Sequence, residues 1–222
     1  MMKTRIALIH AVRVAIDPVQ DAFRRLWPEA ECTNLLDDGL ALDLERDKVL
    51  TKAMTARFLA LADYSVATGA AGILFTCSAF GEAIEAAERH VRIPVLKPNA
   101  AMFEAALAAG RRIAMLATFQ PSVASMEEEF RQMAAQMQPG ATIESYCVPG
   151  AMAALKDGNA AEHDRLIAES APRFRGFDAV LLAHFSTARA EAAVRVVLDT
   201  PVYTSPESAV QKIRSLIAAG RA

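Results

Sequence analysis

A cysteine in one part of this 222-residue chain stands opposite a histidine in a similar second part. When the sequence is shifted by 107 residues, Arg5–Ile9 falls on Arg112–Leu116 and Cys77 falls on His184. A thiol and an imidazole can each hold or release a proton. Two related halves that each supply one such group could act on opposite sides of a ligand. This arrangement favours proton transfer at carbon without a cofactor.

Cys77 directly follows a buried strand-like run, Ile73–Phe75. The pattern predicts a strand that breaks into a turn and then a helix, where free backbone N–H groups favour a thiolate. The N–H groups of Ser78 and Ala79 could bind a substrate carboxylate, and Thr76 lies beside them. The alternative interpretation is a buried structural cysteine.

His184 follows the matching apolar run of the second half, Ala179–Ala183. Its reference pKa near 6.5 suits proton transfer at neutral pH. Phe185 and Ser186 complete the candidate substrate contacts here, and Ser186 or Thr187 could also cap the following helix. The alternative is a histidine held by a neighbouring backbone group.

Four further candidates lie at or just after the first strands of the two halves, two in each half. Thr118 and Ser122 could hold a carboxylate, cap the next helix, or do both. His10 and Arg13 occupy the corresponding stretch of the first half, where Arg13 could pair with a distal carboxylate or lie on the surface. Because ligands of parallel α/β folds bind beyond the carboxyl ends of strands, these positions support one site.

Short apolar runs alternate with helical patterns along the whole chain, as in parallel α/β proteins. We predict two pseudo-symmetric lobes, 1–110 and 111–222, each a mostly parallel sheet flanked by helices, with the active site in the cleft between them. The last helix of the first lobe is free to cross to the second. The predicted strands are 5–10, 31–36, 72–76 and 93–96, then 112–117, 142–147, 179–183 and 201–203. A long helix is predicted at 45–68, and Gly110 and Gly220 are predicted to end helices in the left-handed conformation.

Composition excludes several classes of protein. A net charge of −2 does not favour nucleic acid as a partner. No apolar run reaches the roughly 18–20 residues of a membrane helix, and Ile6–Ile9 is too short for a signal-peptide core. We therefore expect a cytoplasmic protein that binds a small molecule.

Metal and cofactor motifs do not appear in the sequence. Cys32, Cys77 and Cys147 lack metal-ligand spacing, and we interpret Cys32 and Cys147 as structural. His163 and Asp164 are interpreted as a surface pair. There is no Gly-rich phosphate loop, HExxH or GxSxG pattern, so we expect no cofactor and no metal.

Over its whole length, in element order and in its repeat, the chain resembles the aspartate/glutamate racemase superfamily, which includes hydantoin racemases, maleate isomerases and arylmalonate decarboxylases. The segment from Thr76 to Ala79 is similar to the first cysteine motif of that family. Ala117 and Thr118, with Ser122, are similar to its carboxylate-binding segment. The resemblance implies an isomerase acting on a small carboxylate, with one cysteine from each lobe flanking the α-carbon, and it suggests a homodimer.

The chain departs from the family pattern at His184, where the second cysteine is expected. Three outcomes stay open. Cys77 and His184 could exchange protons on opposite faces of an amino-acid-like carboxylate. A single thiol could protonate one face after decarboxylation of a malonate-type acid, or Cys77 could attack an activated double bond in a cis–trans isomerisation. A small-carboxylate binding protein is the non-enzymatic alternative.

Overall fold

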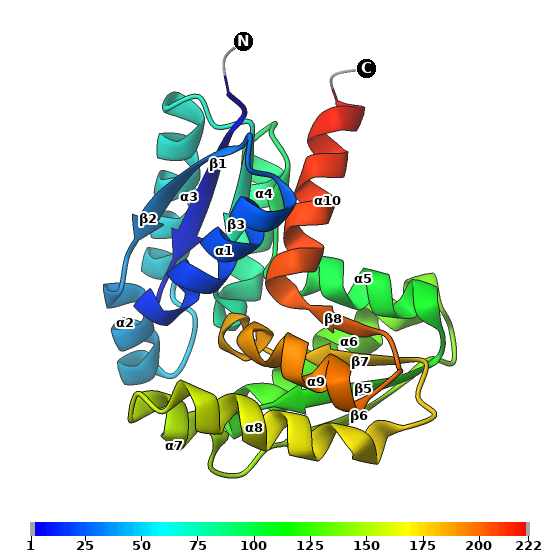
Figure 1. Cartoon of the computed structure of the whole chain (residues 1–222). Helices are drawn as coiled ribbons and strands as arrows, with labels where there is room; N and C mark the ends of the chain where they lie inside the picture. Colours follow the sequence, from blue (N-terminus) through cyan, green and yellow to red (C-terminus); the bar gives the residue numbers. More distant parts are fainter. Residues whose placement is uncertain (1–2, 221–222) are drawn as a thin grey trace. The chain divides into compact units, whose positions relative to one another are not determined.

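A computed structural model describes residues 3–220 of the chain, and within them eight strands form two sheets (Figure 1). None of the helices in that range is both long and apolar enough to cross a membrane. The strands are β1 (Arg5–His10), β2 (Glu31–Leu36), β3 (Gly72–Phe75), β4 (Val95–Leu96), β5 (Arg112–Ala117), β6 (Thr142–Cys147), β7 (Ala179–Leu182) and β8 (Val202–Thr204).

Helices connect the strands throughout. The α-helices are α1 (Ile16–Leu26), α2 (Gly39–Asp47), α3 (Lys52–Ala67), α4 (Gly81–His90), α5 (Ala100–Ala109), α6 (Val123–Met137), α7 (Ala151–Lys156), α8 (Ala160–Ser170), α9 (Glu191–Val197) and α10 (Ser205–Ala219). Short 3-10 turns are η1 (Arg13–Ala15), η2 (Ser78–Phe80), η3 (Gln120–Ser122), η4 (Ala171–Phe174) and η5 (Phe185–Ala190).

The two sheets share one topology, β2-β1-β3-β4 and β6-β5-β7-β8, with every strand pair parallel. Ile9 of β1 pairs with Phe75 of β3, and Leu116 of β5 pairs with Leu182 of β7. The predicted α/β fold with two similar halves is therefore confirmed. In each sheet the strands end at one common edge, which is where Cys77 and His184 follow β3 and β7.

The chain divides into two compact units. The first comprises the residues up to Ala101 together with those from Ala209 onward, and the second is Met102–Ser208. The first unit is therefore built from two separate stretches of sequence. Most of α10 belongs to the first unit, and most of α5 to the second.

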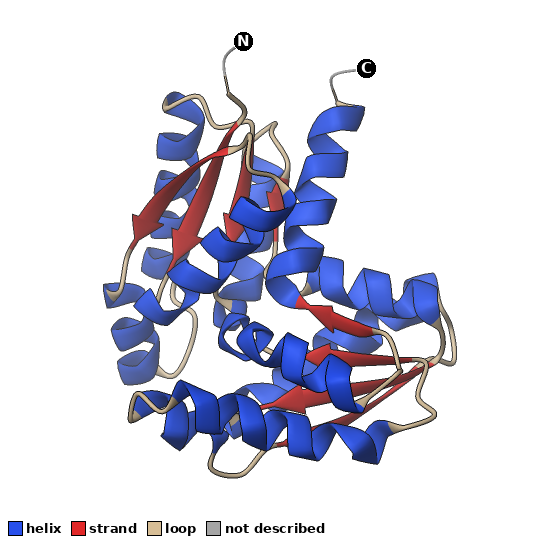
Figure 2. Cartoon of the chain, viewed as in Figure 1, coloured by secondary structure: helices blue, strands red, loops and turns tan. Residues whose placement is uncertain are grey.

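In the first unit, helices cover both faces of the sheet (Figure 2). On one face Phe58 of α3 packs against Phe75 of β3 and Phe80 of η2, with ring centroids 5.1 and 5.0 Å apart. On the other face α10 approaches β3 closely, because a Cβ on Gly72 would lie 2.9 Å from the Ile213 side chain. A larger residue at position 72 would therefore push the Ile213 side chain away from the strand.

The second unit also buries both faces of its sheet. Phe103 of α5 and Phe130 of α6 meet edge to face on one side, with centroids 5.7 Å apart. Ile167 of α8 and Val194 of α9 join Leu116 of β5 in a separate buried cluster on the other side. Parallel strands buried on both faces read as continuous apolar runs, which explains why their positions were predictable.

The long helix predicted at 45–68 is interrupted in the structure. Lys48 ends α2 in the left-handed conformation (φ 59°), and the Thr51 hydroxyl begins α3 by accepting the Met54 N–H at 3.2 Å. The prediction of a left-handed Gly110 is also wrong, as is that for Gly220, since neither has a positive φ. Gly110 is needed for space instead, because an added Cβ would overlap the Asp178 side chain.

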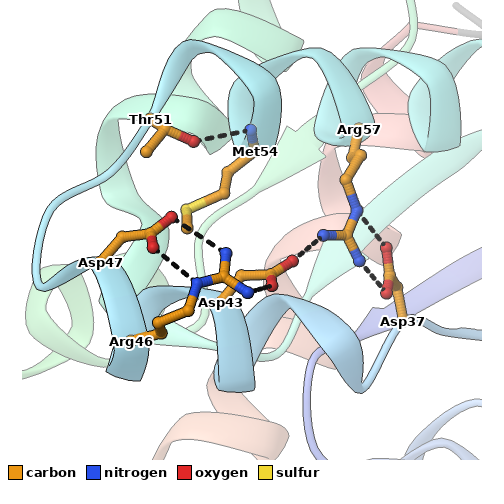
Figure 3. Close-up of polar contacts among 7 residues, drawn as sticks. All are labelled: Asp37, Asp43, Arg46, Asp47, Thr51, Met54 and Arg57. Atoms are coloured by element: carbon orange, nitrogen blue, oxygen red, sulfur yellow. Dashed lines mark hydrogen bonds and ion pairs between the residues drawn. The ribbon is translucent and has the colours of Figure 1, made fainter.

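An arginine-centred cluster holds the segment after β2 (Figure 3). Arg57 of α3 donates two hydrogen bonds to Asp37, one of them 2.8 Å from Nε, and a third of 2.5 Å to Asp43 of α2. The Asp37 N–H in turn donates to the His10 carbonyl at 3.0 Å. Arg57 therefore ties two helices to the end of β1. Arg46 pairs with Asp43 and Asp47 nearer the solvent.

We expect Arg57→Ala to lower the free energy of unfolding by about 1–2 kcal/mol, since it leaves two partly buried carboxylates without their shared partner. Arg46→Ala is the matched control and should change stability by about 0.5 kcal/mol or less, because the Arg46 side chain is 69% exposed. Urea unfolding measures both. Equal effects of the two substitutions would show that Arg57 contributes no more than a surface ion pair.

Candidate functional site

Cys77 lies between β3 and η2 in the first unit, with ordinary extended backbone (φ −120°, ψ 114°). Burial raises the pKa of its thiol, and a hydrogen bond from the Ala79 N–H opposes this rise only in part. The expected effect of backbone N–H groups is thus present, but desolvation is larger. Cys77 is therefore a protonated thiol at neutral pH, rather than the thiolate that its strand-end position predicted.

Thr76, beside Cys77, is held by a buried histidine. The His10 Nδ1 lies 2.8 Å from the Thr76 hydroxyl, and its Nε2 lies 3.0 Å from Asn34 Oδ1. Since an amide oxygen only accepts, Nε2 carries the proton and Nδ1 accepts from Thr76, whose contact with the Ile9 carbonyl is longer, at 3.4 Å. Burial lowers the pKa of His10, and the hydrogen bond with Asn34, which raises the pKa, has a smaller effect. His10 therefore holds Thr76 through a neutral ring with both nitrogens engaged.

The remaining candidates of the first unit lie at the surface or in the turn. Arg13 is exposed and pairs with Asp38 at 3.2 Å. Ser78 is partly buried and Ala79 is exposed, both in η2. Cys32 lies in β2, where burial raises its pKa to about 11.

His184 lies between β7 and η5 in the second unit. Its Nε2 is 2.6 Å from the Ser122 hydroxyl, which also lies 2.9 Å from the Phe119 carbonyl. Burial lowers the pKa of His184 to about 4, despite an opposing effect of the Ala183 backbone. The imidazole is therefore neutral at pH 7. Ser122 occupies the N-cap position of α6 but makes no capping hydrogen bond, because its hydroxyl is used by His184 and Phe119.

Thr118 continues β5 beside His184. The Ala183 N–H donates to the Leu116 carbonyl at 2.8 Å, which sets Thr118 and His184 level on adjacent strands. Within residues 3–220, the buried Thr118 hydroxyl and His184 Nδ1 have no hydrogen-bond partner. Buried polar atoms are nearly always paired, so these two can be satisfied by a ligand or water.

Thr204, which we did not predict as a candidate, ends the neighbouring strand β8. Its buried hydroxyl also has no partner among the residues the structure describes. The sequence contained the relevant signal, because Thr204 directly follows the strand predicted at 201–203 and the same strand-end rule applies to it. Phe185 is buried and Ser186 partly buried in η5.

The backbone of His184 is strained (φ 73°, ψ 150°), in a region that is almost confined to glycine. Contacts on η5 hold it there. The Thr187 hydroxyl donates to the carbonyls of Ala183 and His184, so it does not cap a helix. Arg189 pairs with Asp164 of α8 at 2.9 Å.

His163, predicted on the surface, is fully buried, with its Nδ1 2.8 Å from Asp164. The carboxylate that Arg189 binds is therefore itself fixed by a core residue. Strain of this kind persists only where neighbours over-determine it, and it gathers at functional sites.

We expect His184→Gly to be more stable than His184→Ala by about 1–3 kcal/mol, because glycine adopts this backbone freely. At an ordinary position inside a helix or strand, the alanine variant is instead more stable than the glycine variant by about 0.5–1 kcal/mol. The equivalent position supplies the control: Cys77→Gly should be less stable than Cys77→Ala, since Cys77 has ordinary backbone angles. Urea unfolding of the four variants decides, and an alanine variant at His184 as stable as the glycine variant would contradict the strain.

No group of three or more histidine, cysteine, aspartate or glutamate side chains in residues 3–220 is arranged to hold a metal ion. Within each unit the site residues that lie near one another carry hydroxyls and an imidazole, and in the first unit also a thiol. Within each unit the chemistry they offer is proton donation and acceptance, together with hydrogen bonding to an anion.

Solved structures share this fold across nearly the whole chain. Allantoin racemase from Klebsiella pneumoniae matches with a TM-score of 0.71 and 18% identity, over 98% of this chain and 89% of that one. Glutamate racemase from Francisella tularensis, in complex with D-glutamate, matches with a TM-score of 0.71 and 12% identity, over 99% of this chain and 82% of that one. A variant of arylmalonate decarboxylase matches with a TM-score of 0.64 and 18% identity, over 97% of this chain and 94% of that one. The fold is that of two-unit α/β racemases.

The chain belongs to the Asp/Glu/Hydantoin racemase family, whose sequence profile matches residues 19–137. It is thus an isomerase by family, as the resemblance implied. Among curated proteins, none matches the sequence closely enough to count as a relative.

Proposed function

We propose that this protein is a cofactor-independent racemase or isomerase of a small, amino-acid-like carboxylate, which moves a proton at the α-carbon. Cys77 and His184 are the acid and the base. The observation that carries the proposal is their equivalence: each follows the same strand of its own sheet, β3 in one unit and β7 in the other. Membership of a racemase family supports the same chemistry.

The protonation states of the two groups are complementary. Burial raises the pKa of Cys77 and lowers that of His184 to about 4, so both groups are uncharged at neutral pH. One holds a proton to give and the other holds a free lone pair. His184 takes the α-proton and becomes an imidazolium, while the Cys77 thiol gives its proton to the opposite face and becomes a thiolate. The reverse reaction starts from those charged forms and restores the neutral pair.

An α-proton is only weakly acidic, so the enolate that forms must be stabilised. We assign this role to the Thr118 hydroxyl, which has no hydrogen-bond partner among residues 3–220, and to the N–H group of Ser78, which follows Cys77 at the strand end; the Ala79 N–H instead donates to Cys77. Ser186, which follows the histidine in the same way, is the corresponding contact of the second unit. Phe185 provides a buried apolar wall beside it.

A second function is favoured by one specific observation, the protonated state of Cys77. A single thiol that holds its proton at neutral pH could protonate one face of an enolate left by loss of carbon dioxide from a malonate-type acid. In that reaction His184 would bind rather than exchange a proton. The product would then carry its new proton on one face only.

Proton NMR in deuterated water tests these functions with a panel of small carboxylates: aspartate, glutamate, other amino acids, hydantoins, maleate and substituted malonates. We expect the α-proton signal of one substrate to disappear as deuterium replaces it, because either group that takes up the proton exchanges it with solvent. A chiral assay then gives the stereochemical course. Product formation without exchange in the starting material would favour the lyase, and silence across the panel would favour a binding protein.

A further inference from the structure

The Ser122 hydroxyl lies between two groups that compete for its single proton. The Phe119 carbonyl is 2.9 Å from Oγ, and His184 Nε2 is 2.6 Å from it. A carbonyl oxygen can only accept a hydrogen bond, whereas a neutral imidazole has one nitrogen that donates and one that accepts. The direction of the hydrogen bonds of the Ser122 hydroxyl therefore decides which nitrogen of His184 bears the proton.

Only one assignment satisfies both contacts. If Ser122 donates to Phe119, its oxygen is free to accept a proton from Nε2, and each short distance is a hydrogen bond. If Ser122 instead donates to Nε2, the Phe119 carbonyl keeps its hydrogen bond from the Ser122 N–H at 3.2 Å but faces a bare hydroxyl lone pair at 2.9 Å, so that the contact between the two oxygens becomes repulsive. The first arrangement places the imidazole proton on Nε2. The lone pair is then on Nδ1, a buried atom for which no residue in 3–220 provides a well-aligned hydrogen bond; the contact of the ring with the Ala183 backbone raises its pKa by less than burial lowers it.

We propose that Ser122 is a positioning residue that fixes His184 as the Nε2–H tautomer, so that Nδ1 is the atom that takes and returns the substrate proton. The second half of this statement rests on the proposed function, and the first half does not. When Nδ1 takes a proton, the new imidazolium keeps its Nε2–H bond to Ser122, so no group has to rotate during the step. Ser122 thus acts on the base, in addition to any contact with the carboxylate.

Long-range proton–nitrogen NMR of the free enzyme tests the tautomer directly, because protonated and unprotonated ring nitrogens resonate far apart. The chain contains four histidines, so His184 is assigned by the signal that His184→Gln removes. We expect a protonated Nε2 and an unprotonated Nδ1 in the wild type. In Ser122→Ala we expect the two nitrogen shifts to move towards each other, as the tautomers mix. Ser122→Thr keeps the hydroxyl and should restore the wild-type pattern.

Ser125→Ala is the matched control, since that hydroxyl lies in the first turn of α6 and donates to the Ser122 carbonyl rather than to His184. It should leave the His184 signals unchanged, as should the signals of His10, His90 and His163 in every Ser122 variant. A proton on Nδ1 in the wild type would overturn the proposal. Unchanged His184 signals in Ser122→Ala would overturn the role of Ser122. Neither outcome depends on a substrate, so a silent carboxylate panel would reject the proposed function alone.

Discussion

Cys77→Ala is expected to reduce α-proton exchange by about 10³-fold or more, because the alanine side chain can neither give nor hold a proton. The fold should be unaffected, since Cys77 is only partly buried and alanine fits its ordinary backbone angles. The measurement is the rate of deuterium incorporation into whichever carboxylate responds to the wild type. Urea unfolding of the same sample excludes a folding defect.

Cys32→Ala and Cys147→Ala are the matched controls for the thiol. Burial raises the pKa of all three cysteines, so the controls share the protonation state of Cys77 but not its place after β3. Cys147 is the more stringent of the two, because it is the last residue of β6. Comparable activity in all three variants would remove Cys77 from the mechanism.

His184→Gln is expected to lower turnover by about 10²-fold or more, since an amide has no basic lone pair to take the α-proton. Glutamine keeps a polar side chain and suffers the same backbone strain at φ 73°, so the substitution isolates the loss of the base. The deuterium exchange rate again measures it. An unchanged rate would assign His184 a structural role and favour one-base chemistry at Cys77.

The same variant should change how stability depends on pH. In the folded protein the pKa of His184 is about 4, below its reference value of 6.5, so between these values the unfolded chain binds a proton that the folded chain does not. Acidification through this window therefore costs the wild type up to about 3 kcal/mol, and above pH 6.5 the cost vanishes. His184→Gln should lose this part of the slope. Cys77→Ala is the control and should keep the slope, since it leaves His184 in place and the raised pKa of the Cys77 thiol lies outside this window.

The central strands β1, β3, β5 and β7 could be predicted from the sequence because strands buried on both faces leave a continuous apolar run. Cys77 and His184 could be singled out because the internal repeat aligned them. What the sequence did not contain was the arrangement of polar groups around them. The contact between Ser122 and His184 joins residues 62 positions apart, and it depends on the side-by-side packing of β5 and β7.

Two helix caps that the sequence left open are absent for a common physical reason. Serine and threonine at the start of a helix often cap it, so capping by Ser122 or Thr187 stood beside ligand binding as an expected role. In the structure a short 3-10 turn separates each of these strands from its helix, and the hydroxyls bond to neighbours at the strand end. Local preference was overridden by groups that only the folded sheet brings near.

The division of the chain also determines the order in which its parts can be completed. The second unit is continuous, so all of its residues are available once synthesis has passed Ser208. The first unit still lacks α10, whose Ile213 packs against the glycine of β3. During synthesis the first sheet must therefore wait without α10 on one of its faces while the second unit is made. The first unit therefore begins to leave the ribosome before the second unit but completes its fold after it.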